Sequence, residues 1–130
     1  MSLAKERRFE AFKEFLGRFV VELNVASKEG AVVLVEGKRD VRALRLLGYS
    51  GGLFAVSDLS KAATRPKLLE HDKVIILTDL DSEGRRLAAK CAKLLPAMGL
   101  KPSLAERKRL SAASKGIFLH VENLRRFARE

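Results

Sequence analysis

KVIILTDLDSEG, residues 73–84, joins an unbroken apolar run to a cluster of acidic residues. The run Lys73–Thr78 has the length and β-branched content of a strand buried on both faces, and a helix with one apolar side follows at about Glu83–Leu95. The same order occurs earlier, where Ala31–Val35 is the strand and Arg39–Leu47 the helix. Strands that alternate with helices predict βαβ units on a parallel sheet, and therefore an α/β fold.

The rest of the chain adds one long helix and several short elements. Residues 3–27 carry an apolar stripe at helical spacing, which predicts an amphipathic helix packed on the sheet. The stripe consists of Phe9, Phe12, Leu16, Phe19, Val20 and Leu23. The remaining expectations are strands at 53–56, 101–106 and 116–121, a short helix within 59–73, a turn at 110–115 and a basic helical turn at 123–129.

Composition narrows the class of protein. A chain of 130 residues that is 47% hydrophobic is the size of one domain and is not disordered. No apolar run approaches a membrane span and the start has no signal-peptide pattern, so we expect a cytoplasmic protein without membrane partners.

The single cysteine, Cys91, excludes an internal disulfide and a cysteine zinc site, and we expect it to be a small core residue. His71 and His120 show no ligand spacing and receive no role.

Charge points to a polyanionic partner. Lysine and arginine number 26 against 16 acidic residues, a net charge of +10, and residues 101–130 are the most basic part. This excess of positive charge favours binding to nucleic acid or to an anionic membrane surface. The alternative is the charge-rich surface of a thermophile, which the absence of glutamine also fits.

Acidic residues follow both buried strands. Sites in open α/β sheets lie beyond the carboxyl ends of the strands, so Glu36, Asp79 and Asp81 should share one crevice. Asp79 and Asp81 lie on one side of an extended segment, and Glu83 follows two residues later. Hard oxygen ligands of this kind favour Mg²⁺ or Mn²⁺. In the alternative interpretation, Asp81 or Ser82 only caps the following helix; capping and metal binding are compatible.

Groups suited to phosphate surround these acids. Gly37 and Gly84 leave room for backbone to approach a phosphate. Basic side chains would hold the nucleic-acid backbone without reading bases. The candidates are Lys38, Arg39, Arg42, Arg85 and Arg86 near the acids, and Arg107, Lys108, Arg109 and Lys115 further along the chain.

The pair VEGKRD (residues 35–40) and TDLDSEG (residues 78–84) resembles the two motifs of the Toprim domain, over about residues 31–122. The resemblance implies a Rossmann-like sheet of about four parallel strands between helices. It also implies that Glu36 acts as general acid or base and that Asp79 and Asp81 bind Mg²⁺. Glu83 matches a third acid found in some members, so the implied metal set is Glu36, Asp79, Asp81 and Glu83.

Among Toprim branches, the sequence is most similar to the nuclease group that matures 5S ribosomal RNA and to small archaeal Toprim proteins. The sole tyrosine, Tyr49, lies inside the core, so the attacking tyrosine of topoisomerases has no counterpart. We therefore expect a Mg²⁺- or Mn²⁺-dependent nuclease acting on structured RNA. The alternative is a non-catalytic nucleic-acid-binding subunit of a larger complex. The expected layout is one domain, 1–130, with helix 3–27, core 31–122 and basic tail 123–130; the oligomeric state stays open, a dimer included.

Overall fold

A four-stranded parallel sheet organises the chain in the computed structural model, which describes residues 2–115 and 117–128. The strands are β1 (Ala31–Val35), β2 (Leu53–Ala55), β3 (Lys73–Ile76) and β4 (Lys101–Ser103). Their order across the sheet is β2-β1-β3-β4, so β1 and β3 occupy the centre. Every residue of β1 is buried, as expected for a strand covered on both faces. The α/β fold predicted from the sequence is confirmed.

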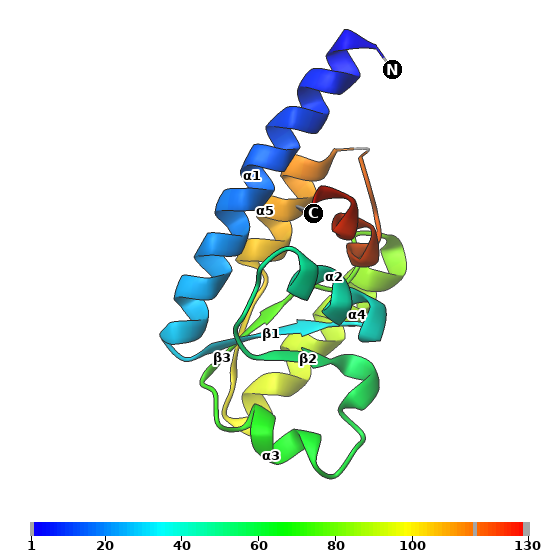
Figure 1. The fold of residues 1–130 in the computed structure, drawn as a ribbon. Helices are drawn as coiled ribbons and strands as arrows, with labels where there is room; N and C mark the ends of the chain where they lie inside the picture. The colour runs from blue at the N-terminus through cyan, green and yellow to red at the C-terminus, as the bar shows by residue number, and fades with distance from the viewer. Residues whose placement is uncertain (1, 116, 129–130) are drawn as a thin grey trace.

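Over residues 2–115 and 117–128, five α-helices and three short 3₁₀-helices cover the sheet (Figure 1). The α-helices are α1 (Leu3–Lys28), α2 (Lys38–Leu46), α3 (Thr64–Leu68), α4 (Ser82–Leu94) and α5 (Ala105–Ser114); the 3₁₀-helices are η1 (Val56–Asp58), η2 (Leu95–Met98) and η3 (Val121–Phe127). Of the described residues, none belongs to a helix that is long and apolar enough to cross a membrane.

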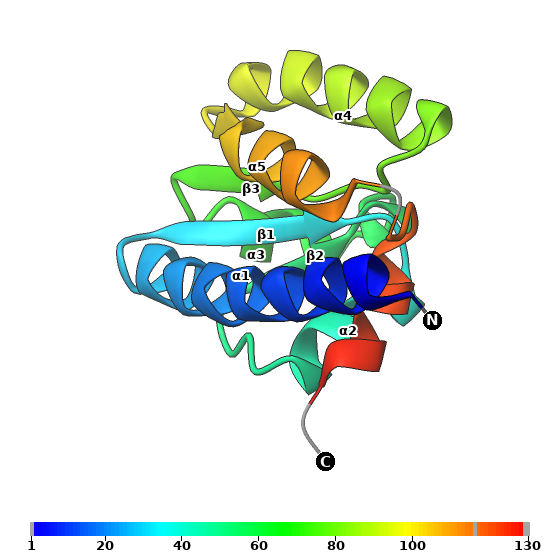
Figure 2. The ribbon, with the colours of Figure 1, turned by 90° about the horizontal axis from the view of Figure 1, so that it is seen from above.

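Alternate residues of the central strands face two separate cores. Val33 and Val35 pack with residues of α1, α5 and η3, whereas Val32 and Leu34 pack with α3 and α4. Figure 2 shows α1 and α4 on opposite sides of the sheet. Five of the six residues of the stripe predicted on α1 are buried, and the sixth, Phe9, is half-buried. The buried five are Phe12, Leu16, Phe19, Val20 and Leu23. Cys91 is also buried in the α4 core, as expected.

Three predictions in the last third of the chain need correction. Residues 110–115 were expected to form a turn, but α5 runs through Ser114 because its residues are good helix formers and Leu110 is buried. The strand expected at 101–106 ends at Ser103, where α5 is about to begin. The strand expected at 116–121 is absent over 117–121; Gly116 lies outside the described residues. The backbone of this segment forms its hydrogen bonds with the loop after β3 instead of with a strand. The carbonyl of Leu119 and the N–H of Val121 make these bonds.

Candidate metal centre

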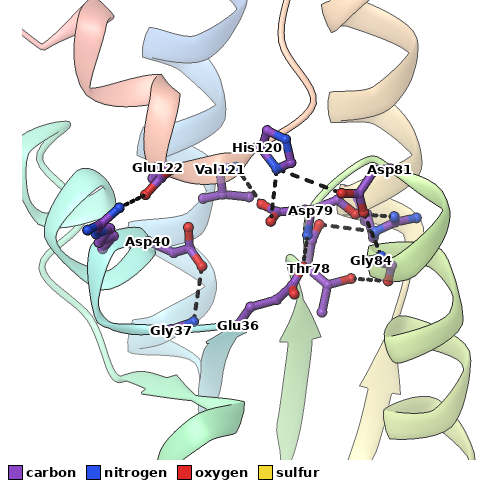
Figure 3. Close-up of polar contacts among 12 residues, drawn as sticks. Glu36, Gly37, Asp40, Thr78, Asp79, Asp81, Gly84, His120, Val121 and Glu122 are labelled. Carbon is purple, nitrogen blue, oxygen red and sulfur yellow. Dashed lines mark hydrogen bonds and ion pairs between the residues drawn. The ribbon is translucent and has the colours of Figure 1, made fainter.

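Glu36 and Asp79 meet at the carboxyl-terminal edge of the sheet, because β1 and β3 are parallel neighbours. The backbone N–H of Asp79 donates a hydrogen bond of 2.7 Å to Glu36 Oε2. Figure 3 shows both side chains in one cluster with Asp40, Asp81 and His120. Two acids separated by 43 positions in the sequence therefore lie side by side.

Asp81 both caps α4 and faces the cluster. Its Oδ1 accepts a hydrogen bond of 2.7 Å from the N–H of Gly84, which is the usual N-cap arrangement. Its Oδ2 lies 3.7 Å from Nδ1 of His120. Capping thus uses one carboxylate oxygen of Asp81 and leaves the other turned towards the cluster. Helix capping and metal binding by Asp81 are therefore compatible.

Gly84 allows the start of α4 to pack on the backbone of the acidic loop. A Cβ at this position would overlap the carbonyl group of Asp79. The hydroxyl of buried Thr78 also donates to the carbonyl of Gly84, at 2.6 Å. In contrast, a Cβ on Gly37 would meet no atom within 4 Å. Of the two glycines predicted to make room for phosphate, only Gly37 borders open space.

The segment of residues 117–121 closes over the acidic loop. The N–H of Val121 donates to Asp79 Oδ1 at 2.6 Å, and the N–H of Leu80 donates to the carbonyl of Leu119 at 2.7 Å. Between these two bonds, His120 directs Nδ1 to within 3.3 Å of Asp79 Oδ2. Sequence reasoning gave His120 no role, because its 41-residue separation from Asp79 carries no local signal.

Arg107 supports the loop from α5. Its guanidinium donates to the carbonyls of Thr78 (3.2 Å) and Asp79 (2.5 Å). Burial lowers the pKa of Arg107, and the nearby charge of Arg85 acts in the same direction. A residue predicted to bind nucleic acid thus holds the backbone beneath the acids.

Asp40 is a further acid of the cluster that the sequence did not single out. Only 7% of its surface is exposed, and its Oδ2 accepts a hydrogen bond of 3.0 Å from the N–H of Gly37. Burial raises the pKa of Asp40, and the charges of Asp79 and Glu122 add to this effect. The third position of α2 is where an acid caps its own helix, a signal that was available in the sequence.

The surroundings raise the pKa of two members of the cluster, Glu36 and His120. Burial raises the pKa of Glu36, and the neighbouring charge of Asp79 raises it further, against the effect of the backbone hydrogen bond. The hydrogen bond with Asp79 raises the pKa of His120. A carboxyl with a raised pKa takes up and releases protons closer to neutral pH, as a general acid or base must.

The donor set fits a divalent ion. One ligand atom from each of Asp79, Asp81 and His120 lies within 4.8 Å of the others. Atoms that share an ion at about 2.1 Å must lie within roughly 4.2 Å of one another, so small side-chain movements suffice. Glu36 stands next to this group rather than in it, and Glu83 is an exposed residue of the first turn of α4.

The predicted basic residues fall into two sets. Those near the acids are exposed: Lys38, Arg39 and Arg42 on α2, and Arg85 and Arg86 on α4. Arg39 lies 3.8 Å from Glu122. On α5, Arg109 pairs with Glu22 at 2.8 Å and its guanidinium lies over the ring of Phe19, so it joins α5 to α1. Lys108 and Lys115 are exposed.

Comparisons with known proteins show the family to which the chain belongs. A Toprim domain model matches residues 30–106, more than half of the chain, so the chain belongs to the Toprim domain family. A UPF0292 protein of Methanosarcina barkeri is 36% identical over 119 residues, covering 91% of this chain and 80% of that protein. A UPF0292 protein of Pyrococcus horikoshii is 36% identical over 124 residues, covering 95% of this chain and 86% of that protein.

A solved structure shares the fold. It is described as a putative protein from Aquifex aeolicus, with 33% identity and a TM-score of 0.66, covering 82% of this chain and 94% of that one. The archaeal relatives fit the expected small archaeal Toprim type. The closer similarity to the group that matures 5S ribosomal RNA remains a prediction.

Proposed function

We propose that the chain is a cytoplasmic nuclease that uses Mg²⁺ or Mn²⁺ to hydrolyse phosphodiester bonds, with structured RNA as its preferred substrate. The observation that carries the proposal is the hydrogen bond between the N–H of Asp79 and the carboxylate of Glu36. This bond supports the proposal because it holds Glu36, the residue proposed to transfer the proton, against Asp79, a candidate metal ligand. Membership of the Toprim family supports a role with nucleic acid, whereas the preference for RNA depends on the resemblance to the 5S ribosomal RNA group.

Asp79 and Asp81 would hold the ion, with Glu36 and Glu83 at its margin. When bound, such an ion polarises the scissile phosphate and stabilises the leaving oxygen. Glu36 would take a proton from the attacking water or give one to the leaving group. Its raised pKa supports this assignment, and proton transfer of this kind contributes about 10²–10⁴ in rate.

Exposed cations on both sides of the acids would position the substrate. Arg85 and Arg86 lie near the start of α4, and Lys38, Arg39 and Arg42 lie on α2. Contacts from such residues to phosphates fix the register of a nucleic acid without reading its sequence. The open space at Gly37 would allow a phosphate to approach the start of α2.

A second candidate function is a non-catalytic subunit that binds nucleic acid within a larger complex. It is favoured by the way Asp79 is engaged, since one carboxylate oxygen accepts from Val121 and the other faces His120. A carboxylate held by protein partners can serve to shape a loop. In that case the acidic cluster would be structural and the basic residues would carry the function.

Cleavage and binding assays separate the two candidates. Wild-type protein is incubated with labelled hairpin RNA and with DNA of the same sequence, in Mg²⁺, Mn²⁺ or EDTA. We expect RNA cleavage that requires metal and that Glu36→Gln lowers at least about 100-fold while RNA binding is retained. Glu70→Gln, at an exposed acid just after α3 that belongs to neither acidic motif, is the matched control. Binding without cleavage under every metal condition would favour the non-catalytic subunit.

A further inference from the structure

His120 is the nitrogen donor of the cluster. Its Nδ1 lies 3.3 Å from Asp79 Oδ2 and 3.7 Å from Asp81 Oδ2, so one atom faces a carboxylate oxygen of each acid (Figure 3). The Oδ1 atoms of both aspartates are already used, by Val121 and Gly84. The atoms that remain, one from each side chain, therefore converge.

The backbone holds His120 in this position. The bond from Leu80 to the carbonyl of Leu119 and the bond from Val121 to Asp79 fasten the chain on both sides of the histidine. Both bonds end on the loop that carries the two aspartates. The imidazole is about half exposed, so its position follows from the fastened backbone and not from burial in a core. A ligand held in place before the ion arrives costs less ordering on binding.

We infer that His120 is the third protein ligand of the ion and that its nitrogen makes the site prefer Mn²⁺ to Mg²⁺. The inference rests on the metal site of the proposed function. Two carboxylates suit both ions, whereas an imidazole nitrogen is a ligand of transition metals and Mg²⁺ prefers oxygen throughout. Selectivity between the two ions would thus come from the 117–121 segment, and not from the two acidic motifs.

A simpler role for His120 is that of a hydrogen-bond partner that orients Asp79. The two roles differ in what they predict for selectivity. A partner that only orients a carboxylate contributes equally to the binding of both ions, since both use the same carboxylate oxygen. A nitrogen ligand contributes to Mn²⁺ and little to Mg²⁺.

The test measures dissociation constants for Mn²⁺ and Mg²⁺ by calorimetry on the intact chain. The variants are His120→Ala, His120→Asn and Asp79→Asn, with His71→Ala as matched control because His71 contacts Phe54 instead of the acids. Thermal unfolding of each variant confirms that it is folded. We expect His120→Ala to weaken Mn²⁺ binding roughly tenfold and Mg²⁺ binding less than about twofold. His120→Asn, which keeps a hydrogen-bond donor without the ring nitrogen, should behave like His120→Ala.

Each other outcome has a defined meaning. Equal losses for both ions in His120→Ala, or restored Mn²⁺ preference in His120→Asn, would overturn the inference and leave the proposed metal site intact. Wild-type protein that binds neither ion, or Asp79→Asn that binds both as well as wild type does, would remove the metal site of the proposed function itself.

Discussion

The loops after β1 and β3 carry the acids of one site but are built differently. The loop after β1 is short and local: Glu36 leads into Gly37, whose N–H is bound by Asp40 three residues on. The loop after β3 is held by partners far away in the sequence, among them Arg107 and the 117–121 segment. Apart from the hydrogen bonds that Glu36 accepts from the N–H groups of Asp79 and Ser57, the first loop is shaped by its own residues. The second loop is shaped by tertiary contacts from α5 and from the 117–121 segment.

The difference predicts how the two loops tolerate change. A substitution in the loop after β1 should change the stability of the protein little. The loop after β3 should lose its structure when a distant residue that contacts it is replaced, and the protein should lose more stability. Four substitutions test this contrast, in order of decreasing effect.

Gly84→Ala should have the largest effect. Helix propensity alone predicts a gain of about 1 kcal/mol for this change inside a helix. Because a Cβ would overlap the carbonyl of Asp79, we expect instead a loss of about 3 kcal/mol, measured by urea unfolding. Gly37→Ala, which meets open space, should cost less than about 1 kcal/mol. Equal losses in the two variants would remove the contrast between the loops.

Arg107→Met should come next. The substitution keeps an apolar stem and removes two hydrogen bonds to the carbonyls of Thr78 and Asp79, so we expect a loss of about 2 kcal/mol. Lys108→Met, at an exposed neighbour on α5, should stay within about 0.5 kcal/mol of wild type. If Arg107→Met leaves the free energy of unfolding unchanged, the loop after β3 does not need support from α5.

Asp40 gives the loop after β1 a pH dependence. Its pKa is raised in the folded state, so the folded protein holds this proton more tightly than the unfolded chain does. The contribution is therefore favourable at low pH and lost as the pH rises through the range above about pH 4, the ordinary pKa of an aspartate. The stability of wild type relative to Asp40→Asn should fall across this range, in unfolding curves recorded at each pH. If the stability of wild type relative to Asp40→Asn instead rises with pH, the direction assigned to the pKa shift of Asp40 is wrong.

Arg85→Ala should have the smallest effect, confined to binding. We expect RNA affinity to fall about threefold and the slope of log affinity against log salt to become shallower by about 1, with stability unchanged. Arg109→Ala is the control, because Arg109 is engaged with Glu22. If both variants weaken binding alike, the basic surface extends to α5 and is not centred on the acids.

The same contrast explains what the sequence could and could not predict. Glu36 and Asp79 follow apolar strands directly, so their meeting at one sheet edge followed from local pattern and parallel topology. Arg107 and His120 join the site only through contacts over 28 and 41 residues, and nothing in their neighbourhood encodes those contacts. Residues 117–121 have the composition of a strand, but their hydrogen bonds go to the acidic loop.

The central claim is that acids from the two loops gather around one divalent ion. A crystal structure of the wild-type protein with Mn²⁺, read from the anomalous signal of the metal, tests it most directly. The account predicts a single strong peak at about 2.1–2.3 Å from a carboxylate oxygen of both Asp79 and Asp81, with Glu36 beside it. Mn²⁺ bound elsewhere, with the two aspartates keeping only their bonds to Gly84, Val121 and His120, would contradict it.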